Sequence, residues 1–314
     1  MRFLIKETES GKEKVKLSVK DKKLLQLLIQ DSRASITQLA KKVGISKSAV
    51  VQKIESLKKR GVWLDYHFHT RPALFDSDMY VFDISTPLGM TTKEVNVELL
   101  KLKETIGILW YNSPYNLVMA VKTNEPGEMF DKIGEIIEIK KFRIRRVRDN
   151  WFHPMHLFKE MPDKHVEFTR AKPSVDAADK KILSYLYGNP DASFAEISEN
   201  TKFAPVTIKK RLMKLEKNKT IIAFSGFVDP WLCGKEVVGV SFIVKGKKET
   251  EKLIKHLLEI PQTSNIWEFD DEWNVNFVLW VDNQINVNKI IHNIYKNFKI
   301  LDTEISVLAA MVGK

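Results

Sequence analysis

The sequence repeats itself over most of its length, and this repeat constrains the fold more than any other feature. At a spacing of 158 residues the two halves align without a gap from Asp21, which falls on Asp179. The register still holds near the end of each half, where Asn116 falls on Asn274. A gapless repeat of this length indicates two copies of one structural unit. We therefore expect the 314-residue chain to fold as a tandem pseudo-dimer.

Each copy opens with the apolar periodicity of three short helices. In the first copy, residues 20–29 and 36–43 carry apolar side chains at helical spacing, and Gly44 is typical of a helix C-terminus. Ser46 can then cap a third helix with an inward apolar face. This is the pattern of a helix-turn-helix unit, whose third helix enters the major groove of DNA. The following "KKRG" and "VWLDYHF" predict a wing strand beside that groove.

The second copy keeps this pattern, but its residues at the helix ends are less typical of helix caps. Lys202 replaces Gly44 and Ala204 replaces Ser46, but Pro205 suits the first turn of a helix. The third helix remains basic, so we expect a second helix-turn-helix unit.

The net positive charge of the chain lies in these two units. The chain has 51 Lys and Arg against 40 Asp and Glu, which gives a net charge of +11. Residues 17–63 hold eleven basic and three acidic residues, and residues 175–221 hold nine and six. These segments carry +8 and +3, so the remaining 220 residues are neutral overall. Charge concentrated in two helical units favours nucleic acid as the partner over a general role in solubility.

The outward positions of the two third helices and of "KKR" are the predicted contacts with double-stranded DNA. In the first copy they are Ser46, Lys47, Ser48, Val51, Gln52, Lys53, Lys58, Lys59 and Arg60. In the second copy they are Val206, Thr207, Lys209, Lys210, Arg211 and Lys214. Base reading is expected chiefly from Ser48, Gln52, Lys53, Thr207, Lys209 and Lys210. Units of three helices with a basic face also serve as protein-docking modules, which is the alternative interpretation.

A series of predicted strands and helices follows each helical unit. In the first copy the strands are "MYVFDIST", "IGILWYNS", "YNLVMAVKT" and "KKFRIRRVRD", with helices at 92–103 and 128–139. The second copy repeats the order, with helices at 249–258 and 287–298. The order βαββαβ predicts a four-stranded antiparallel sheet with helices on one face. We therefore expect an α+β fold, a tandem repeat of a winged helix-turn-helix and a ferredoxin-like domain, in which each sheet covers the other.

This order resembles the Lrp/AsnC (leucine-responsive, feast/famine) family of transcriptional regulators, of archaeal type, with two copies fused. The residues that carry the resemblance are "DKKLLQLLIQDSRASITQLAKKVGISKSAVVQKIESLKKRGV" in the first half, and "VDAADKKILSYL" with "TIIAFSGFVDPWLCG" in the second. The resemblance covers nearly the entire chain. It implies a sequence-specific regulator whose αβ domains pair and bind small effectors between subunits. One fused chain supplies both partners, allows an asymmetric operator, and can itself form a homodimer.

The predicted boundaries follow from the repeat and the resemblance. We expect a mobile arm at 1–16, winged helix-turn-helix units at 17–66 and 175–224, αβ domains at 67–160 and 225–314, and a linker at 161–174. The longest uncharged apolar stretch is Val237 to Val244, far shorter than the roughly 20 residues of a membrane-spanning helix. No membrane contact is expected. A single cysteine, Cys233, excludes an internal disulfide and fits the cytoplasm.

The effector site implied by the resemblance falls at the turn between the second and third strands of each αβ domain. The candidate residues there are Ser113, Tyr115, Asn116, Asp271, Trp273 and Asn274. Family members usually carry a Gly and an Asp in this turn, whereas Asn stands here in both copies. A neutral amide fits a neutral polar effector better than an ammonium group. The alternative is that both Asn side chains only stabilise a tight hairpin.

An enzyme is the rival interpretation, because siroheme decarboxylases look similar in architecture and "SPYNLVMAV" resembles a stretch of that group. His67, His69, His153 and His156 could bind a tetrapyrrole iron or transfer protons, but the second copy has no counterparts. His67 and His69 alternate on the predicted wing strand, which favours DNA contact or plain exposure. We predict no catalytic residue, metal or cofactor, and keep a chromatin-like, non-specific DNA-binding protein as a further alternative.

Two other features have structural interpretations. The basic run "KKFRIRRVR" at 140–148 predicts a solvated edge strand protected by its charge, with an extension of the DNA-binding surface as the alternative. Five tryptophans fall in the αβ domains, at 110, 151, 267, 273 and 280. Core or interface packing is expected for them rather than a ligand pocket.

Overall fold

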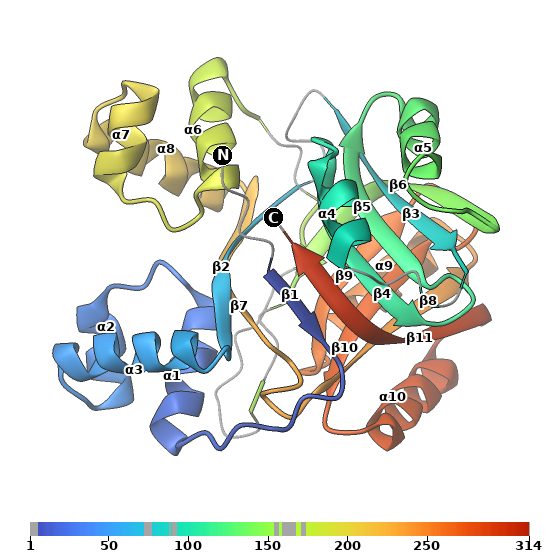
Figure 1. The fold of residues 1–314 in the computed structure, drawn as a ribbon, viewed down its shortest axis with the longest axis horizontal. Coiled ribbons are helices and arrows are strands. Elements are labelled where there is room, and N and C mark those ends of the chain that lie inside the picture. The colour runs from blue at the N-terminus through green and yellow to red at the C-terminus, as the bar shows by residue number, and fades with distance from the viewer. Residues whose placement is uncertain are drawn as a thin grey trace.

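A computed structural model of the chain describes residues 6–71, 77–87, 89, 93–153, 157–158, 168–170 and 174–313. Two three-helix units lie on one side of the molecule, and the two αβ domains lie together on the other side (Figure 1). A pair of strands runs between the helical units (Figure 1). The tandem α+β architecture expected from the repeat is confirmed.

The first helical unit consists of α1 (Val19–Gln30), α2 (Ile36–Val43) and α3 (Lys47–Lys59). Serine side chains cap all three N-termini, and those of α1 and α2 form complete capping boxes. Gly44 ends α2 with φ at 77°, in the left-handed region that glycine adopts without strain. The caps therefore fix the turn between α2 and α3.

The second helical unit consists of α6 (Ala177–Gly188), α7 (Phe194–Thr201) and α8 (Pro205–Lys217). Asp176 and Ser193 form the capping boxes of α6 and α7. Lys202 takes the place of Gly44 and keeps its left-handed conformation, with φ at 64°. Ala204 gives α8 no side-chain cap, but Pro205 stands in its first turn. The same turn is thus built from less favourable residues.

The predicted wing strands pair with one another. Strand β2 (Trp63–Thr70) pairs antiparallel with β7 (Ile221–Val228), so each strand binds its counterpart from the other copy. His67 pairs with Ser225, and these two residues are related by the 158-residue repeat. The pseudo-twofold axis therefore passes through this pair. The strand predicted after each helical unit is present, and it satisfies its backbone groups across the axis.

The αβ domains have the predicted order, with small differences at the element ends. The first contains β3 (Asp78–Ser85), α4 (Lys93–Lys101), β4 (Thr105–Asn112), β5 (Leu117–Thr123), α5 (Pro126–Gly134) and β6 (Lys141–Phe152). The second contains β8 (Glu236–Val244), α9 (Lys247–Leu257), β9 (Thr263–Phe269), β10 (Val275–Val281), α10 (Gln284–Asn297) and β11 (Ile300–Gly313).

The two four-stranded sheets close into one barrel of eight strands. The order is β11-β4-β5-β3-β6-β9-β10-β8, and β8 pairs back onto β11. The helices pack on the outside and cover two separate apolar cores, one for each domain (Figure 1). The sheets therefore join edge to edge as well as facing one another. The basic run at 140–148 is not a free edge strand, because residues 141–146 of β6 pair with β3 and the pairing with β9 begins at Val147.

The two junctions between the halves differ in register. At the β6–β9 junction, Asn150 pairs with Trp267. The repeat relates these residues to Leu308 and Leu109, but at the other junction Leu109 pairs with Met311. The β11–β4 junction is displaced by three residues, so the barrel is only approximately symmetric.

The segment before α1 is not a mobile arm in its described part. Strand β1 (Lys6–Glu9) pairs with β11, and the amide of Val15 donates to the carbonyl of Leu232. The Nζ of Lys12 lies 2.9 Å from Oδ2 of Asp229, which is fully buried. Residues 6–16 thus bind the second copy, and the arm prediction is wrong there.

The tryptophans pack as the preferred interpretation predicted for most of them. Trp110 is buried and donates from Nε1 to Oδ1 of Asn96 at 2.8 Å. Trp151 is buried and stacks on Phe168, in the predicted linker. Linker residues 168–170 are therefore held against the barrel. Within the described residues, the helices include none that is long and apolar enough to span a bilayer.

Candidate DNA interface and effector pocket

The outward face of α3 holds most of the predicted contacts of the first copy. Burial of Val50, Ile54 and Leu57 fixes the rotation of the helix. The exposed side chains are those of Ser46, Lys47, Ser48, Val51, Gln52, Lys58 and Lys59. Ser46 accepts a hydrogen bond from the amide of Ala49 at 3.1 Å, so its hydroxyl acts as the helix cap. The face presents basic, amide and hydroxyl groups, the set that reads base edges and phosphates.

Lys53 and Arg60 are turned toward the protein. The Nζ of Lys53 lies 2.6 Å from Oδ1 of Asp21, and Arg60 donates to the carbonyl of Lys16 at 2.6 Å. Burial opposes ionisation of Asp21, but hydrogen bonds from Lys53 and Ser18 outweigh it and lower the pKa of this carboxyl. Lys53 therefore ties α3 to α1, and its predicted role as a base reader disagrees with this pairing.

The second copy repeats the same tie. Arg211, the counterpart of Lys53, pairs through Nη1 with Asp179 at 2.8 Å and with Asp176 at 2.7 Å. Asp179 is fully buried, and Lys214 lies 3.3 Å from it. Among the predicted contacts on α8, those that are exposed and make no ion pair within the described residues are Val206, Thr207, Lys209 and Lys210. Arg211 is thus a structural residue as placed here, whereas Lys209 and Lys210 face solvent.

The predicted effector asparagines bind backbone in the same way in both copies. The Oδ1 of Asn116 accepts from the amide of Thr86 at 2.8 Å, and its Nδ2 donates to the carbonyl of Thr86. Asn274 makes the equivalent pair with Val244, at 3.0 and 2.7 Å. Each amide ties the hairpin to the end of a neighbouring strand. This is the structural role that the alternative interpretation assigned to them.

Tyr115 and Trp273, which the repeat relates, come together on one guanidinium. The Cζ of Arg143 lies 4.9 Å from the ring of Tyr115 and 5.3 Å from the ring of Trp273. Ser113 donates from its hydroxyl to the carbonyl of Tyr115 at 2.7 Å. Tyr115 and Trp273 therefore pack against the side chain of Arg143, and Ser113 stabilises the turn that carries Tyr115.

Sequence reasoning missed the charged cluster inside the barrel. Asp83 is buried and accepts hydrogen bonds from Nε of Arg143 and from Nη2 of Arg145, each at 3.0 Å. Arg143 also donates to Glu304 at 2.7 Å, which links the two copies. A cavity of about 110 Å³ adjoins this cluster. The sequence of residues 140–148 contains a signal for this cluster, because strand alternation places Arg143 and Arg145 on the same face. Their burial could not be predicted, because it depends on the sheet of the second copy.

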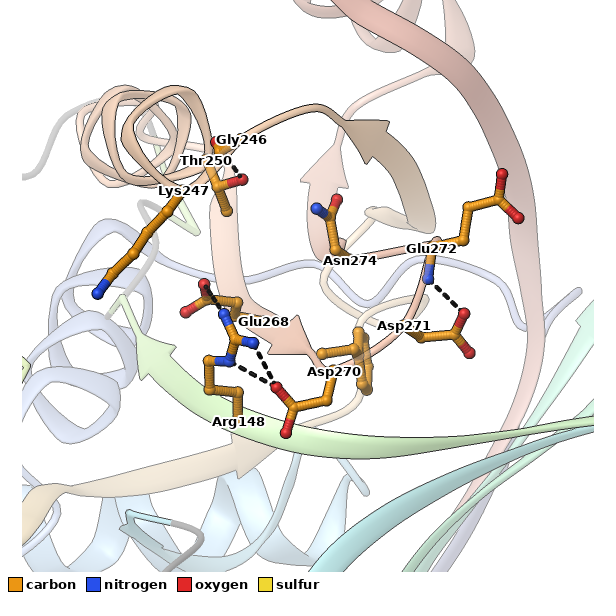
Figure 2. Close-up of a pocket in the computed structure, with 10 residues that line it drawn as sticks. Arg148, Gly246, Lys247, Thr250, Glu268, Asp270, Asp271, Glu272 and Asn274 are labelled. Carbon is orange, nitrogen blue, oxygen red and sulfur yellow. Dashed lines mark hydrogen bonds and ion pairs between the residues drawn. The ribbon is translucent and has the colours of Figure 1, made fainter.

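A larger cavity of about 490 Å³ lies on the second αβ domain (Figure 2). It is lined by Arg148, Gly246, Lys247, Thr250, Glu268, Phe269, Asp270, Asp271, Glu272 and Asn274. Figure 2 shows Arg148 bridging Glu268 and Asp270, while Asp271 and Glu272 stand on the hairpin beside it. The first turn of α9, which has no side-chain cap, closes the opposite side. The cavity therefore has an acidic rim and an open helix N-terminus.

The histidines are not gathered at either cavity. His69 stacks on Phe152 with ring centroids 3.9 Å apart, and His67 lies 4.5 Å from His69. Desolvation and the neighbouring His67 ring hold the pKa of His69 well below its ordinary value. His153 is buried with Nδ1 3.0 Å from the carbonyl of Thr263. His156 lies outside the described residues.

Comparison with known proteins agrees with this geometry. The AsnC-type helix-turn-helix domain matches residues 17–58, and the winged helix-turn-helix DNA-binding domain matches residues 175–222. The HTH-type transcriptional regulator LrpA of Pyrococcus horikoshii is 29% identical over 131 residues, covering 39% of this chain and 89% of the relative. The regulator FL11 of the same species is 26% identical, covering 37% of this chain and 78% of the relative.

One solved structure matches the whole tandem arrangement. The siroheme decarboxylase NirDL covers 92% of this chain with a TM-score of 0.54 and 14% identity, over 90% of its own length. At this identity the likeness shows the fold alone.

The two helix-turn-helix matches define a protein of the DNA-binding transcription regulator class. The chain carries an AsnC-type helix-turn-helix domain at residues 17–58 and a winged helix-turn-helix domain at residues 175–222, and it is similar to archaeal regulators of the Lrp type.

Proposed function

We propose that this chain regulates transcription as a covalent pseudo-dimer that binds an asymmetric operator through α3 and α8. The observation that carries the proposal is the pairing of β2 with β7 across the pseudo-twofold axis. This pairing joins two helix-turn-helix units whose outward helices expose different side chains. In a symmetric dimer both half-sites must be alike, whereas a fused chain can read two different ones.

Charge supports duplex DNA as the partner. Lys47, Lys59, Lys209 and Lys210 are exposed on the two helices, and no ion pair ties them within the described residues. Release of counterions by such lysines makes binding strongly dependent on salt. Lys53 and Arg211 are instead paired with carboxylates of α1 and of the start of α6.

Selection from a random duplex pool at moderate salt tests the proposal. The expected result is one enriched site with two unequal half-sites about one helical turn apart. Retention that is lost with salt and shows no enriched sequence would indicate a chromatin-like role. Failure to retain DNA at any salt would contradict the proposal and favour protein docking.

The cavity beside α9 is the effector site that we propose, with Asp271 and Asn274 on its wall. The uncapped N-terminus of α9 favours a negative group, and the acidic rim at 270–272 favours a positive one. A small zwitterion carries both. A panel of amino acids screened by thermal shift tests this, because a ligand at 100 times its Kd stabilises the folded state by about 2.7 kcal/mol. Asp271→Asn should abolish the shift, and a panel without any hit would contradict the assignment.

A tetrapyrrole enzyme is the second candidate, favoured by the match of the whole tandem fold to a siroheme decarboxylase. His69 stacks on Phe152, and Nδ1 of His153 lies 3.0 Å from the carbonyl oxygen of Thr263. An absorbance scan of the purified protein, before and after addition of an iron porphyrin, separates the two candidates. A stable haem-type band in a protein that selects no DNA site would put the enzyme first.

A further inference from the structure

The outward stripe of α8 is apolar at two positions. Val206 and Met213 are 65% and 58% exposed, and they stand on the side opposite the buried Ile208 and Leu212. Spacings of four and three residues place Val206, Lys210 and Met213 in one row along the helix. A β-branched residue at an exposed helix position contributes nothing to folding and has a low helix propensity. The fold therefore does not explain this stripe.

The first copy has polar groups at the same places. The repeat relates Val206 to Ser48, Lys210 to Gln52 and Met213 to Glu55, and all three residues of α3 are exposed. The two recognition helices are thus alike in backbone and different in chemistry. An amide such as that of Gln52 can bind an adenine edge through two hydrogen bonds, whereas an apolar side chain cannot.

The surroundings of the stripe point to DNA as its occupant. Lys209, Lys210 and Lys217 are exposed around it, so a partner must be acidic at its rim and apolar at its centre. The major groove offers both, because phosphates line its edges and the C5-methyl group of thymine is its apolar feature. An apolar protein surface would leave these lysines without compensation.

We propose that α8 recognises thymine through contact of Val206 with its C5-methyl group, and that Met213 extends this contact along the groove. The second half-site then requires thymine, while the first is read by hydrogen bonds from Ser48 and Gln52. This inference rests on the proposed function, and it specifies what the second half-site contains.

Replacement of thymine by deoxyuridine tests the inference, because it removes only the methyl group. The full chain is titrated against its selected operator, with each thymine of the second half-site replaced in turn. Burial of one methyl-sized group is worth about a fourfold change in an equilibrium constant, so at least one replacement should weaken binding about fourfold. With Val206→Ala, which removes two of the methyl contacts, the same replacement should weaken binding less than in the unaltered protein.

Val19→Ala is the matched control, because Val19 is 70% exposed but lies at the start of α1. It should keep the discrimination of the unaltered protein. A Val206→Ala variant that discriminates as strongly as the unaltered protein would overturn the inference while DNA binding itself stands. If no duplex is bound by any variant, the proposed function fails instead. Far-ultraviolet circular dichroism confirms that each variant folds.

Discussion

At the scale of single residues, the basic side chains of the recognition helices fall into two groups with different tasks. Lys53 and Arg211 occupy equivalent positions and form ion pairs with the buried carboxylates of Asp21 and Asp179. Lys47 and Gln52 face solvent on α3. A cation that is paired with a carboxylate attracts a phosphate less strongly than an unpaired one. Substitutions in the two groups should therefore change DNA affinity to different extents.

Lys47→Ala should weaken binding to specific and random duplexes alike, because a phosphate contact carries no sequence information. The slope of log K against log salt should fall by roughly one unit. Gln52→Ala should instead cost about 1–3 kcal/mol on the selected site and relax preference at one base pair. Fluorescence anisotropy at several salt concentrations measures both. Equal losses on specific and random DNA for Gln52→Ala would contradict its assignment as a base reader.

At the scale of elements, the end of α7 shows how one copy tolerates a residue that the other avoids. Lys202 holds a left-handed conformation with φ at 64°, where Gly44 stands in the first copy at 77°. An L-residue with a side chain in this region is strained by about 1–2 kcal/mol. The turn before α8 is therefore less stable than the turn before α3.

Lys202→Gly should stabilise the protein by about 1 kcal/mol, because glycine removes that strain and its higher entropy in the unfolded chain offsets only part of the gain. Urea denaturation with an unchanged m-value is the measurement. Lys202→Ala is the matched control and should leave stability nearly unchanged, since it keeps a Cβ. A loss of stability with glycine would mean that a contact of the lysine side chain contributes more to the free energy of unfolding than the backbone strain costs.

At the scale of the whole molecule, one buried arginine joins the helical units to the barrel. Arg71 follows β2 and pairs with Asp149 of β6 at 2.6 Å. It also donates to the carbonyls of Asn150 and Thr169, at 2.8 and 2.7 Å. Both ionic groups are buried. Such a pair is costly to break because one charge is left without a partner in a poorly solvated place.

Arg71→Ala should therefore lower the free energy of unfolding by about 3–5 kcal/mol. Arg146→Ala is the matched control, since Arg146 is half-exposed and pairs with Asp78 and Asp270 at the surface. It should cost no more than about 1 kcal/mol. Thermal and urea unfolding of both variants compare the two, and equal effects would contradict the assigned role of Arg71.

A buried lysine at the contact between β5 and α6 gives a pH dependence. The Nζ of Lys122 lies 3.7 Å from the ring centroid of Tyr187, and burial lowers the pKa of this amine to about 7. The unfolded chain keeps the ordinary lysine pKa of about 10.4, so between these values it binds more protons than the folded one. The contribution of this group to stability should rise as pH increases from 7 to about 10.

Lys122→Met should remove this rise and stabilise the protein most at neutral and acidic pH, where the unaltered protein holds a buried charge. Urea midpoints from pH 6 to pH 10 measure the difference. A difference between the two proteins that does not change with pH would show that Lys122 is solvated in the folded state.

Local sequence determined much of this protein. The 158-residue repeat, the Ser46 cap of α3 and the βαββαβ order were all predicted, because periodicity and capping depend on residues within a few turns of one another. The exposed positions of α3 and α8 followed from the same periodicity.

Tertiary structure decided which segments of the two copies pair with one another. The wing strand of each copy pairs with its counterpart, the basic run at 140–148 pairs with β3 and continues into the strand that pairs with β9, and part of the arm forms β1, because unpaired backbone groups bind whichever strand the fold brings near. The ion pairs of Lys53 and Arg211 likewise require carboxylates more than 30 residues away, at Asp21 and Asp179. Sequence fixes which side chains a helix presents, and only packing decides which of them remain outward for a partner.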